Sequence, residues 1–379
     1  MSSDVMFGVD LSLEGYEVET WERYFSFIRH VDDNVWDSIW LGDHLGGLPP
    51  LIPTRNYNVW LIFSLLAEFK RKPLLGTAVT DPHRYHPAVL AQMAMTVDHI
   101  SNGRFILGLG AGEAFNLESY GFDYRRPVTK MVEFVDVLRK LWSSGGKPVS
   151  HEGAFFKLKD AVLEPAPTRK IPVWIAANSP RTRKLAGMIA DGWIPLPFSP
   201  ETYRDGMKEV EAGLKEAGRS RDEFTFAYWN WVFIHEDEEA LQNYLGLKKL
   251  SFPVQFPKEF MASEFWREEK RKLYKRMGFE PEKLSLLSFS SVDQLDLGVL
   301  GQLVEDVPDS FVRDATLMGT KDEVTGKLEK LVRAGAQHIV LMIDNDVAKD
   351  PRNPEPYTYE HVYETLTGEI VPYLKEQYR

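Results

Sequence analysis

Residues Leu74–Gly121 carry the part of the sequence that decides the fold: LLGTAVTDPHRYHPAVLAQMAMTVDHISNGRFILGLGAGEAFNLESYG. The segment predicts a buried strand at Leu74–Val79, a helix that opens after Pro87, and a second buried strand at Arg104–Leu109. A strand, a helix and a strand in this order form the βαβ unit of a parallel sheet. Parallel α/β sheets place ligands at the carboxyl ends of their strands, so we expect the chemistry in the turns after these two strands.

The same alternation of short apolar runs and amphipathic helical patterns continues along the chain. Eight expected strands interleaved with helices predict a single (β/α)8 TIM barrel of the α/β class, and a doubly wound sheet is the competing architecture. The expected strands are Met6–Asp10, Ser38–Leu41, Pro73–Val79, Phe105–Leu109, Pro172–Ala177, Gly192–Pro195, Thr225–Phe233 and His338–Met342. The expected helices are Glu19–Asp32, Asn58–Phe69, Ala88–Ile100, Lys130–Trp142, Pro180–Ala190, Pro200–Ala217 and Lys321–Ala334.

One domain over residues 1–379 is expected, with the remaining residues as insertions into the barrel. These insertions fall at about 43–57, 143–168 and 236–315, and a surface wrap with a last helix covers 344–379. The second insertion resembles a short β excursion, and the third is rich in Phe, Trp, Lys and Glu. Long loops in a compact domain are usually lids or binding walls.

Composition excludes several classes of function. A net charge of -11 repels phosphate backbones and anionic membranes, so neither a nucleic acid nor a membrane is an expected partner. The chain has no cysteine, which removes disulfides, thiol nucleophiles and thiolate metal sites. It shows neither a secretory leader nor an apolar stretch of about 20 residues, so we expect a soluble cytoplasmic protein.

Asp43 and His44 directly follow the second expected strand, so they should face the mouth of the barrel. Histidine exchanges a proton near neutral pH, and Asp43 could orient it or bind a hydroxyl or ring N–H of a ligand. A loop histidine with a structural hydrogen bond fits the same pattern equally well.

Glu113 lies in a glycine-rich turn after the fourth expected strand, GLGAGEAFN. The glycines allow the backbone to approach a flat ligand, and a carboxylate among apolar neighbours suits a proton donor. A tight turn without function is the alternative. The spacing is not that of the GxGxxG dinucleotide-binding fingerprint.

Two further strand ends carry small or polar residues. Ala78, Val79 and Thr80 end the third strand and could press backbone against one face of a planar ring, or simply pack. The fifth strand ends in the run Ala176-Ala177-Asn178-Ser179, where Ser179 is a candidate N-cap before Pro180. The start of that helix could hold a phosphate, or could be an ordinary capped helix.

Other residues carry weaker signals. His83 and His86 have a spacing seen in metal sites, but a third ligand is missing, so no metal is expected. Trp229 and Trp231 alternate along a strand and either line the pocket or, as we favour, pack in the barrel.

Taken together and in order, these segments resemble the luciferase-like superfamily of flavin and deazaflavin oxidoreductases. The resemblance rests on WLGDHL (Trp40–Leu45), GTAVTDPHRYHPAVLAQ (Gly76–Gln92), SNGRFILGLGAGEAFN (Ser101–Asn116), VWIAANSPR (Val173–Arg181) and ADGWIP (Ala190–Pro195). Within the superfamily, Asp43-His44 and the segment Gly112–Asn116 look like the branch that uses coenzyme F420, an 8-hydroxy-5-deazaflavin. The chain is most similar there to the phthiodiolone ketoreductase-like and methylene-tetrahydromethanopterin reductase-like groups.

The resemblance implies roles for the candidate residues. His44 would serve as acid or base toward the substrate's carbonyl or hydroxyl, and Glu113 would protonate or polarise the reacting system. The cofactor would be held by the following residues: Asp43, Gly112, Asn116, Thr80, a cis peptide at Ala78-Val79 behind the ring, and Ala176, Ala177, Asn178 and Ser179 at its phosphate. The implied reaction is hydride transfer between C5 of F420 and a carbonyl or alcohol substrate, carried out by a homodimer.

The chain also departs from its relatives. Alcohol and glucose-6-phosphate dehydrogenases of this branch place a tryptophan four residues after the histidine, where this chain has Leu48. Those two substrates are therefore in doubt. Pterin reduction, an FMN-dependent monooxygenase and a non-catalytic F420 carrier are the alternative functions.

Overall fold

A closed parallel barrel of eight strands organises the molecule, as the sequence predicts. The computed structural model describes residues 4–12, 21–31, 35–46, 56–69, 71–282, 296–344 and 359–378. Within them the barrel order is β1-β2-β3-β4-β7-β8-β9-β11, and β11 pairs back onto β1. The barrel strands are β1 (Met6–Asp10), β2 (Ser38–Leu41), β3 (Leu74–Thr77), β4 (Phe105–Leu109), β7 (Val173–Ile175), β8 (Gly192–Trp193), β9 (Thr225–Ile234) and β11 (His338–Ile343).

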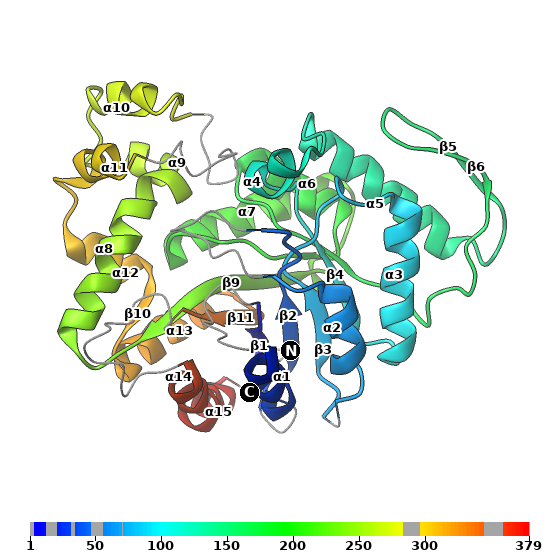
Figure 1. Ribbon diagram of the computed structural model, residues 1–379, viewed down its shortest axis with the longest axis horizontal. Coiled ribbons are helices and arrows are strands. Elements are labelled where there is room, and N and C mark those ends of the chain that lie inside the picture. The colour runs from blue at the N-terminus through cyan, green and yellow to red at the C-terminus, as the bar shows by residue number, and fades with distance from the viewer. Residues whose placement is uncertain are drawn as a thin grey trace.

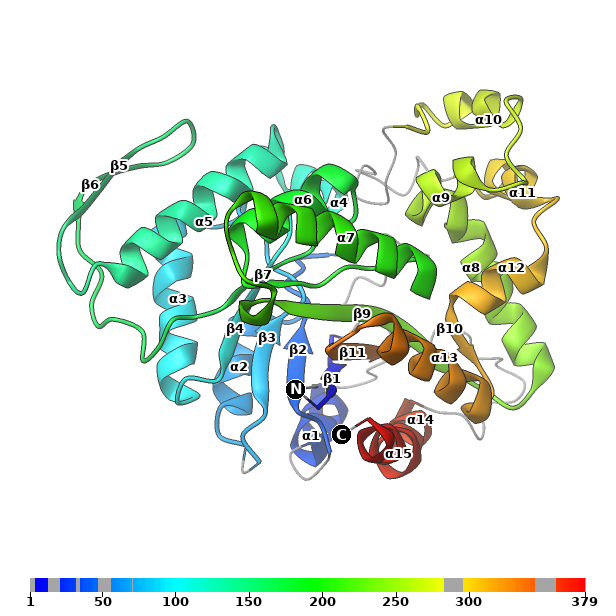
Figure 2. The same ribbon diagram turned by 180° about the vertical axis from the view of Figure 1, so that it is seen from behind.

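Helices between successive strands cover the outside of the barrel (Figure 1). Figure 2 shows the same arrangement from behind, with α6 and α7 across the face opposite α14 and α15. The helices are α1 (Trp21–His30), α2 (Val59–Leu66), α3 (Pro87–Ile100), α4 (Ala114–Leu117), α5 (Pro127–Ser143), α6 (Pro180–Ile189), α7 (Pro200–Glu216), α8 (Glu238–Gln255), α9 (Pro257–Ala262), α10 (Lys270–Arg276), α11 (Leu297–Val304), α12 (Asp309–Ala315), α13 (Lys321–Ala334), α14 (Tyr359–Thr365) and α15 (Val371–Gln377). Among the described residues, none of these helices combines the length and the apolar character needed to cross a bilayer.

Large aromatic side chains fill the inside of the barrel. Trp40 and Trp174 lie with ring centroids 5.1 Å apart and pack with Ile106 and Val340. Glycine on β3 makes room for them, because a Cβ on Gly76 would lie 2.3 Å from the Trp40 ring. The barrel is therefore a packed core whose open space lies at the strand ends.

Two features differ from the sequence expectation, and a third confirms it. The third strand ends at Thr77, and the cis peptide bond Ala78-Val79 follows it. The expected β excursion is confirmed as an antiparallel hairpin of β5 (Val149–Glu152) and β6 (Lys157–Ala161). An additional strand, β10 (Leu317–Gly319), pairs with the far end of β9, and its three residues are too few for a period-2 pattern to reveal it.

The insertion between β9 and β10 forms the helices α8 to α12 and builds a hydrophobic core of its own. That core includes Phe252 and Leu300 from the insertion, and it reaches the barrel through Phe115 and Phe198. Parts of the expected insertion 43–57, the C-terminal wrap and the position of Leu48 lie outside the described residues.

Candidate active site

The predicted site residues follow four neighbouring barrel strands. Asp43 and His44 come after β2, and Ala78 begins the segment after β3. Glu113 follows β4, and Ala176 follows β7. Since β2, β3, β4 and β7 are adjacent in the barrel and parallel, their carboxyl ends meet at one rim.

The structure brings His44 and Glu113 together, although they are far apart in sequence. His44 Nε2 lies 3.2 Å from Glu113 Oε2, and the two side chains are 13% and 22% exposed. The ring of Phe115 meets the His44 ring edge-on, with centroids 6.3 Å apart. The glycine-rich turn is shorter than expected, because Glu113 immediately precedes the one-turn helix α4. A protonated imidazole and a carboxylate at this distance stabilise each other's charge.

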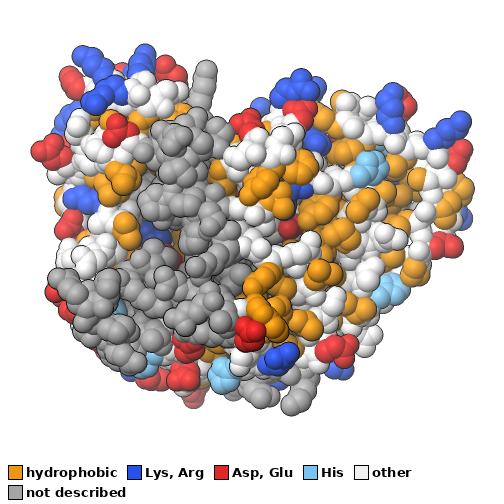
Figure 3. Space-filling view, in the orientation of Figure 1, with side chains coloured by type: hydrophobic (Ala, Val, Ile, Leu, Met, Phe, Trp, Pro, Cys, Tyr) orange, Lys and Arg blue, Asp and Glu red, His pale blue; other side chains and the backbone are white. Residues whose placement is uncertain are grey.

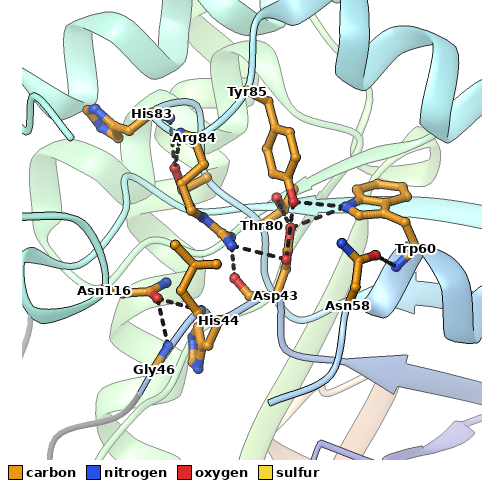
Figure 4. Close-up of polar contacts among 12 residues, drawn as sticks. Asp43, His44, Gly46, Asn58, Trp60, Thr80, His83, Arg84, Tyr85 and Asn116 are labelled. Carbon is orange, nitrogen blue, oxygen red and sulfur yellow. Dashed lines mark hydrogen bonds and ion pairs between the residues drawn. The ribbon is translucent and has the colours of Figure 1, made fainter. Parts of the chain in front are cut away.

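Asp43 is buried at the centre of a hydrogen-bond network (Figure 4). Its Oδ2 accepts from Thr80 Oγ1 at 2.7 Å and from Trp60 Nε1 at 3.3 Å. Its Oδ1 accepts from Arg84 Nη1 at 3.2 Å. The carboxylate is thus held by donors of the protein itself, and Thr80 uses its hydroxyl for the same purpose.

Arg84 is a residue of this site that the sequence reasoning missed. Its Nε lies 2.6 Å from Asp81 Oδ2, so the guanidinium joins Asp81 to Asp43. Burial lowers the pKa of Arg84, but the charges of Asp43 and Asp81 outweigh it and raise that pKa above its ordinary value. The available signal was a cation in the loop after β3, three residues beyond Asp81.

Asn116 braces the loop that carries His44. Its Oδ1 accepts from the backbone N–H of Leu45 at 2.7 Å and of Gly46 at 3.4 Å (Figure 4). The side chain is buried on α4. Because Glu113 immediately precedes the same short helix, Asn116 ties the Glu113 and His44 segments to each other.

Small side chains line the rim beside this pair. A Cβ on Gly110 would lie 2.8 Å from Val79 and 3.9 Å from Ala176. Ala78, Val79 and Ala176 pack against the aromatic cluster inside the barrel. We call this part of the rim, formed by Gly110 and the small side chains of Ala78, Val79 and Ala176, the flat bed. The Thr80 N–H, which follows Val79, donates to Gly108 O at 3.0 Å.

The start of α6 is capped as predicted. Ser179 accepts from the N–H of Thr182, Thr182 returns a bond to the Ser179 N–H, and Pro180 occupies the first turn. The Asn178 side chain accepts from Leu196 N–H at 3.1 Å. Arg183 pairs with Glu209, so its charge is already compensated. Ala177 is buried behind this turn.

His83 and His86 do not point toward a shared metal. The His83 ring nitrogens lie 2.9 Å from Asp123 O and 3.0 Å from Ala111 O. Burial is the largest influence on the pKa of His83 and lowers it. His86 caps α3 by accepting from Ala88 N–H. His83 therefore supports the Gly112 turn from below, where a Cβ on Gly112 would lie 3.0 Å from its ring.

A second missed residue is Asp10, at the end of β1. Its Oδ2 accepts from Trp229 Nε1 at 2.8 Å, and its Oδ1 accepts from Ser12 N–H at 2.9 Å. Trp229 is half-buried on β9. The contact joins β1 to β9 past the intervening strand β11 and spans 219 residues of sequence, which explains why no local pattern pointed to it.

Comparisons with known proteins place the chain in a family and match its fold. Residues 4–338 match the sequence model of the luciferase-like monooxygenase family. The chain is 26% identical over 371 residues to 5,10-methylenetetrahydromethanopterin reductase of Archaeoglobus fulgidus, covering 97% of this chain and 99% of that protein. It is 29% identical over 331 residues to phthiodiolone/phenolphthiodiolone dimycocerosates ketoreductase of Mycobacterium tuberculosis, covering 81% and 83%.

Solved structures show the same fold. An F420-dependent secondary alcohol dehydrogenase in complex with an F420-acetone adduct superposes with a TM-score of 0.76 at 22% identity, covering 98% of this chain and 99% of that one. The coenzyme F420 dependent tetrahydromethanopterin reductase of Methanopyrus kandleri superposes with a TM-score of 0.70 at 25% identity, covering 98% and 100%. From the family match over most of its length, this chain belongs to the luciferase-like monooxygenase family.

Proposed function

We propose that this protein is a coenzyme F420-dependent oxidoreductase that moves a hydride between C5 of the deazaflavin and a carbonyl or alcohol carbon. The observation that carries the proposal is the His44–Glu113 pair, 3.2 Å apart at the strand rim beside the flat bed. One relative that matches 97% of the chain is named as a methylenetetrahydromethanopterin reductase, and another that matches 81% as a ketoreductase. An F420-dependent alcohol dehydrogenase shares the fold.

The residues at the rim fit a planar cofactor with an anionic arm. A side chain at position 110 would collide with Val79, so Gly110 keeps the bed open for a flat ring. The N–H groups at the start of α6 suit a phosphate, because the helix dipole is positive there. We assign Ala78, Val79 and Gly112 to the ring, and Ala176, Ala177, Asn178 and Ser179 to the phosphate. When bound, the deazaflavin supplies the hydride chemistry.

Near the cofactor, we assign an indirect role to Asp43, Thr80 and Asn116 rather than direct contact through their side-chain oxygens. Their side-chain oxygens are engaged by the protein, so they set the shape of the loop that carries His44. Asn116 also retains amide N–H donors that can reach a ligand. We propose that these residues hold the cofactor by fixing the loops around it.

His44 moves the proton that accompanies the hydride. In the direction of reduction, the imidazolium donates a proton to the oxygen of the substrate carbonyl, which becomes a hydroxyl. In the direction of oxidation, neutral His44 accepts that proton. Glu113 stabilises the imidazolium across the 3.2 Å contact, and the buried Asp43 network keeps the loop in place and excludes water.

Titration of F420 and of FMN into the purified protein tests the cofactor. We expect F420 fluorescence to be quenched or shifted and FMN to give no response.

Substitution His44→Gln should lower kcat with a ketone by about 100-fold or more while F420 still binds, since a general acid contributes about 100- to 10,000-fold to the rate. The exposed His99 offers the matched control, His99→Gln, which should leave kcat unchanged. Full activity of the His44 variant would remove this residue from the mechanism.

A reductase acting on a pterin is the second candidate, favoured by the match to the Archaeoglobus fulgidus enzyme over 97% of the chain. Reduction of an imine-like pterin carbon needs no proton donor for a ketone oxygen. Intact turnover of a methylene-pterin by the His44→Gln variant would therefore support it. Rapid reoxidation of a bound yellow flavin by air would instead indicate an FMN-dependent monooxygenase, and F420 that binds without ever turning over would indicate a carrier.

We also propose that the protein is a homodimer. Leu61 and Leu65 on α2 are exposed, as are Val89 and Ile100 on α3. Figure 3 shows hydrophobic side chains on this side of the molecule. Exposed apolar patches on one face favour contact with another protein surface, and a second copy would cover this one. A cytoplasmic location stays a prediction from composition.

A further inference from the structure

A buried carboxylate interrupts the apolar pattern at the end of β1. Phe7 and Val9 are apolar and fully buried, as expected for a strand that is covered on both faces, yet Asp10 is also 0% exposed. Acidic side chains are almost never fully buried unless they are paired. A charge withdrawn from water is stable only where hydrogen bonds compensate it, so the partners of Asp10 show what it does.

One carboxylate oxygen of Asp10 reaches the loop that carries His44. Its Oδ1 accepts from the N–H of Ser12 at 2.9 Å and from the Ser12 hydroxyl. The same hydroxyl accepts from the N–H of Gly42 at 2.6 Å. A Cβ on Gly42 would lie 3.0 Å from Ser12 Oγ and 3.6 Å from Ala78 O. Asp10 is therefore tied, through one hydroxyl, to the start of the His44 loop beside the flat bed.

The other oxygen of Asp10 holds the ring of Trp229. Trp229 Nε1 donates to Oδ2 at 2.8 Å, a length typical of a hydrogen bond to an ionised acceptor. As the sequence analysis favours, Trp229 packs in the barrel, in one cluster with Ala78 and Val79, but its side chain is only half-buried. Its backbone N–H donates to Pro195 O at 3.2 Å, just beyond the end of β8. Trp229 is thus level with the rim.

The backbone between the two partners of Asp10 is itself held in place. The Tyr24 hydroxyl donates to Leu11 O at 2.9 Å, and the Leu11 N–H donates to Trp40 O at 2.9 Å. In Figure 1, β1 and β9 belong to one barrel with β11 between them. The carboxylate therefore joins two strands that do not pair with each other, from a fixed point on β1.

We propose that Asp10 is a positioning residue whose two carboxylate oxygens fix the ring of Trp229 and the start of the His44 loop relative to each other. The proposal rests on the proposed function, because proton transfer by His44 is the step that needs this geometry. A carboxylate serves both arms at once. An amide has a single acceptor oxygen, so it would turn its NH2 group toward the N–H of either Ser12 or Trp229.

Two signals from the full chain without cofactor read the two arms separately. Hydrogen–deuterium exchange reports on the Gly42 N–H, and NMR of tryptophan-labelled protein reports on the indole N–H of Trp229. The chain has 10 tryptophans, and the resonance missing from Trp229→Phe identifies the right one.

Three variants should change these signals in different combinations. Ser12→Ala should raise the Gly42 exchange rate by about tenfold, the scale of one lost hydrogen bond, and leave the indole resonance in place. Asp10→Asn should shift the indole resonance, because Ser12 offers two donors to the amide oxygen and leaves the NH2 group facing Trp229. Asp10→Ala should change both signals.

Asp98→Asn is the matched control. Asp98 is also 0% exposed and accepts from the Thr168 N–H at 2.9 Å, but it lies near the end of α3, away from the rim. This variant should leave both signals and kcat unchanged. Equal changes in Asp98→Asn and Asp10→Ala would indicate a general loosening of the barrel and overturn the proposal.

Kinetics with F420 and a ketone connect the network to the reaction. Ser12→Ala and Asp10→Ala should lower kcat by about 10- to 100-fold, the scale of a misplaced reacting group, while the Kd of F420 stays unchanged. An unchanged Gly42 exchange rate in Ser12→Ala, or an unchanged indole resonance in Asp10→Asn, would overturn the network. Wild-type kcat in variants whose signals do change would overturn the positioning role and leave the proposed function standing. The expected signals in a protein that turns over no ketone with F420 would support the network and remove the reaction.

Discussion

Buried charges at the rim show how single residues shape the site. Asp43 is held by Thr80, Trp60 and Arg84, and the guanidinium of Arg84 also pairs with Asp81. Two carboxylates withdrawn from water are tolerated here because one cation lies between them. The loop that carries His44 begins at this network, so its geometry depends on charges that are paired within the protein.

Removing the Arg84 cation should destabilise the folded protein. Substitution Arg84→Leu leaves Asp43 and Asp81 buried without their partner, and we expect the free energy of unfolding to fall by about 3–5 kcal/mol. Arg125→Leu is the control, because the Arg125–Asp123 pair is 86% and 56% exposed. An exposed pair contributes about 0–1 kcal/mol. Urea unfolding of both variants measures the difference, and equal losses would contradict the buried network.

His338 gives a prediction for pH at the opposite end of the barrel. Burial, reinforced by the charge of Lys375, lowers the pKa of His338 from 6.5 to about 3. Its Nε2 lies 2.6 Å from Ser38 Oγ. Between these two pKa values the unfolded chain binds a proton that the folded protein does not. The stability from this group is therefore complete above about pH 6.5 and declines as the pH falls toward about 3.

We expect this group to remove about 2 kcal/mol of stability between about pH 7 and about pH 5. Urea unfolding at the two pH values, on the wild type and on His338→Gln, isolates the contribution. The variant should lose less stability on acidification than the wild type. An identical pH dependence in both proteins would show that His338 is not the titrating group.

At the scale of elements, close helix packing positions the start of α6. A Cβ on Gly213 of α7 would lie 1.9 Å from Lys184 O of α6, and a Cβ on Gly187 of α6 would lie 2.1 Å from Val210 O of α7. The two helices therefore approach each other backbone to backbone. The distance fixes where the capped N-terminus of α6 lies at the rim.

Substitution Gly213→Ala should push α6 and α7 apart. We expect a loss of about 1–3 kcal/mol from overpacking and weaker binding of an F420 phosphate arm. Gly326→Ala in α13 is the control, because no atom lies within 4 Å of the added Cβ. That change should stabilise the protein by about 0.5–1 kcal/mol, since alanine is the better helix former. Thermal unfolding measures the expected loss of stability in Gly213→Ala and the expected gain in Gly326→Ala. A Gly213→Ala variant more stable than the wild type would contradict the close packing of α6 and α7.

At the scale of the whole molecule, a charge placed on the exposed face of α2 and α3 tests the proposed homodimer. Leu61→Glu places a charge at a side chain that is 72% exposed, so it should leave the monomer folded while separating the dimer. Leu247→Glu on α8, 40% exposed, is the matched control and should leave the dimer intact. Sedimentation velocity measures both. A wild-type protein that sediments as a monomer would contradict the proposed homodimer.

Local patterns in the sequence determined the elements and their order. Short buried runs and amphipathic periods predicted the eight barrel strands, because strands covered on both faces are apolar throughout. The Ser179-Pro180 cap and the cis peptide at Ala78-Val79 were also predicted, the first from capping chemistry and the second from resemblance. The placement of His44 and Glu113 at one rim followed from the parallel order of the strands.

Tertiary structure alone decided which side chains meet. Arg84 reaches Asp43 across 41 residues, and Asp10 reaches Trp229 across 219 residues. The first contact depends on the register of β2 against β3, and the second on the barrel bringing β9 to β1 through β11. Periodicity and spacing describe neighbours along the chain, so they carry no information on contacts of this kind. The roles of Arg84 and Asp10 therefore emerged from the folded barrel.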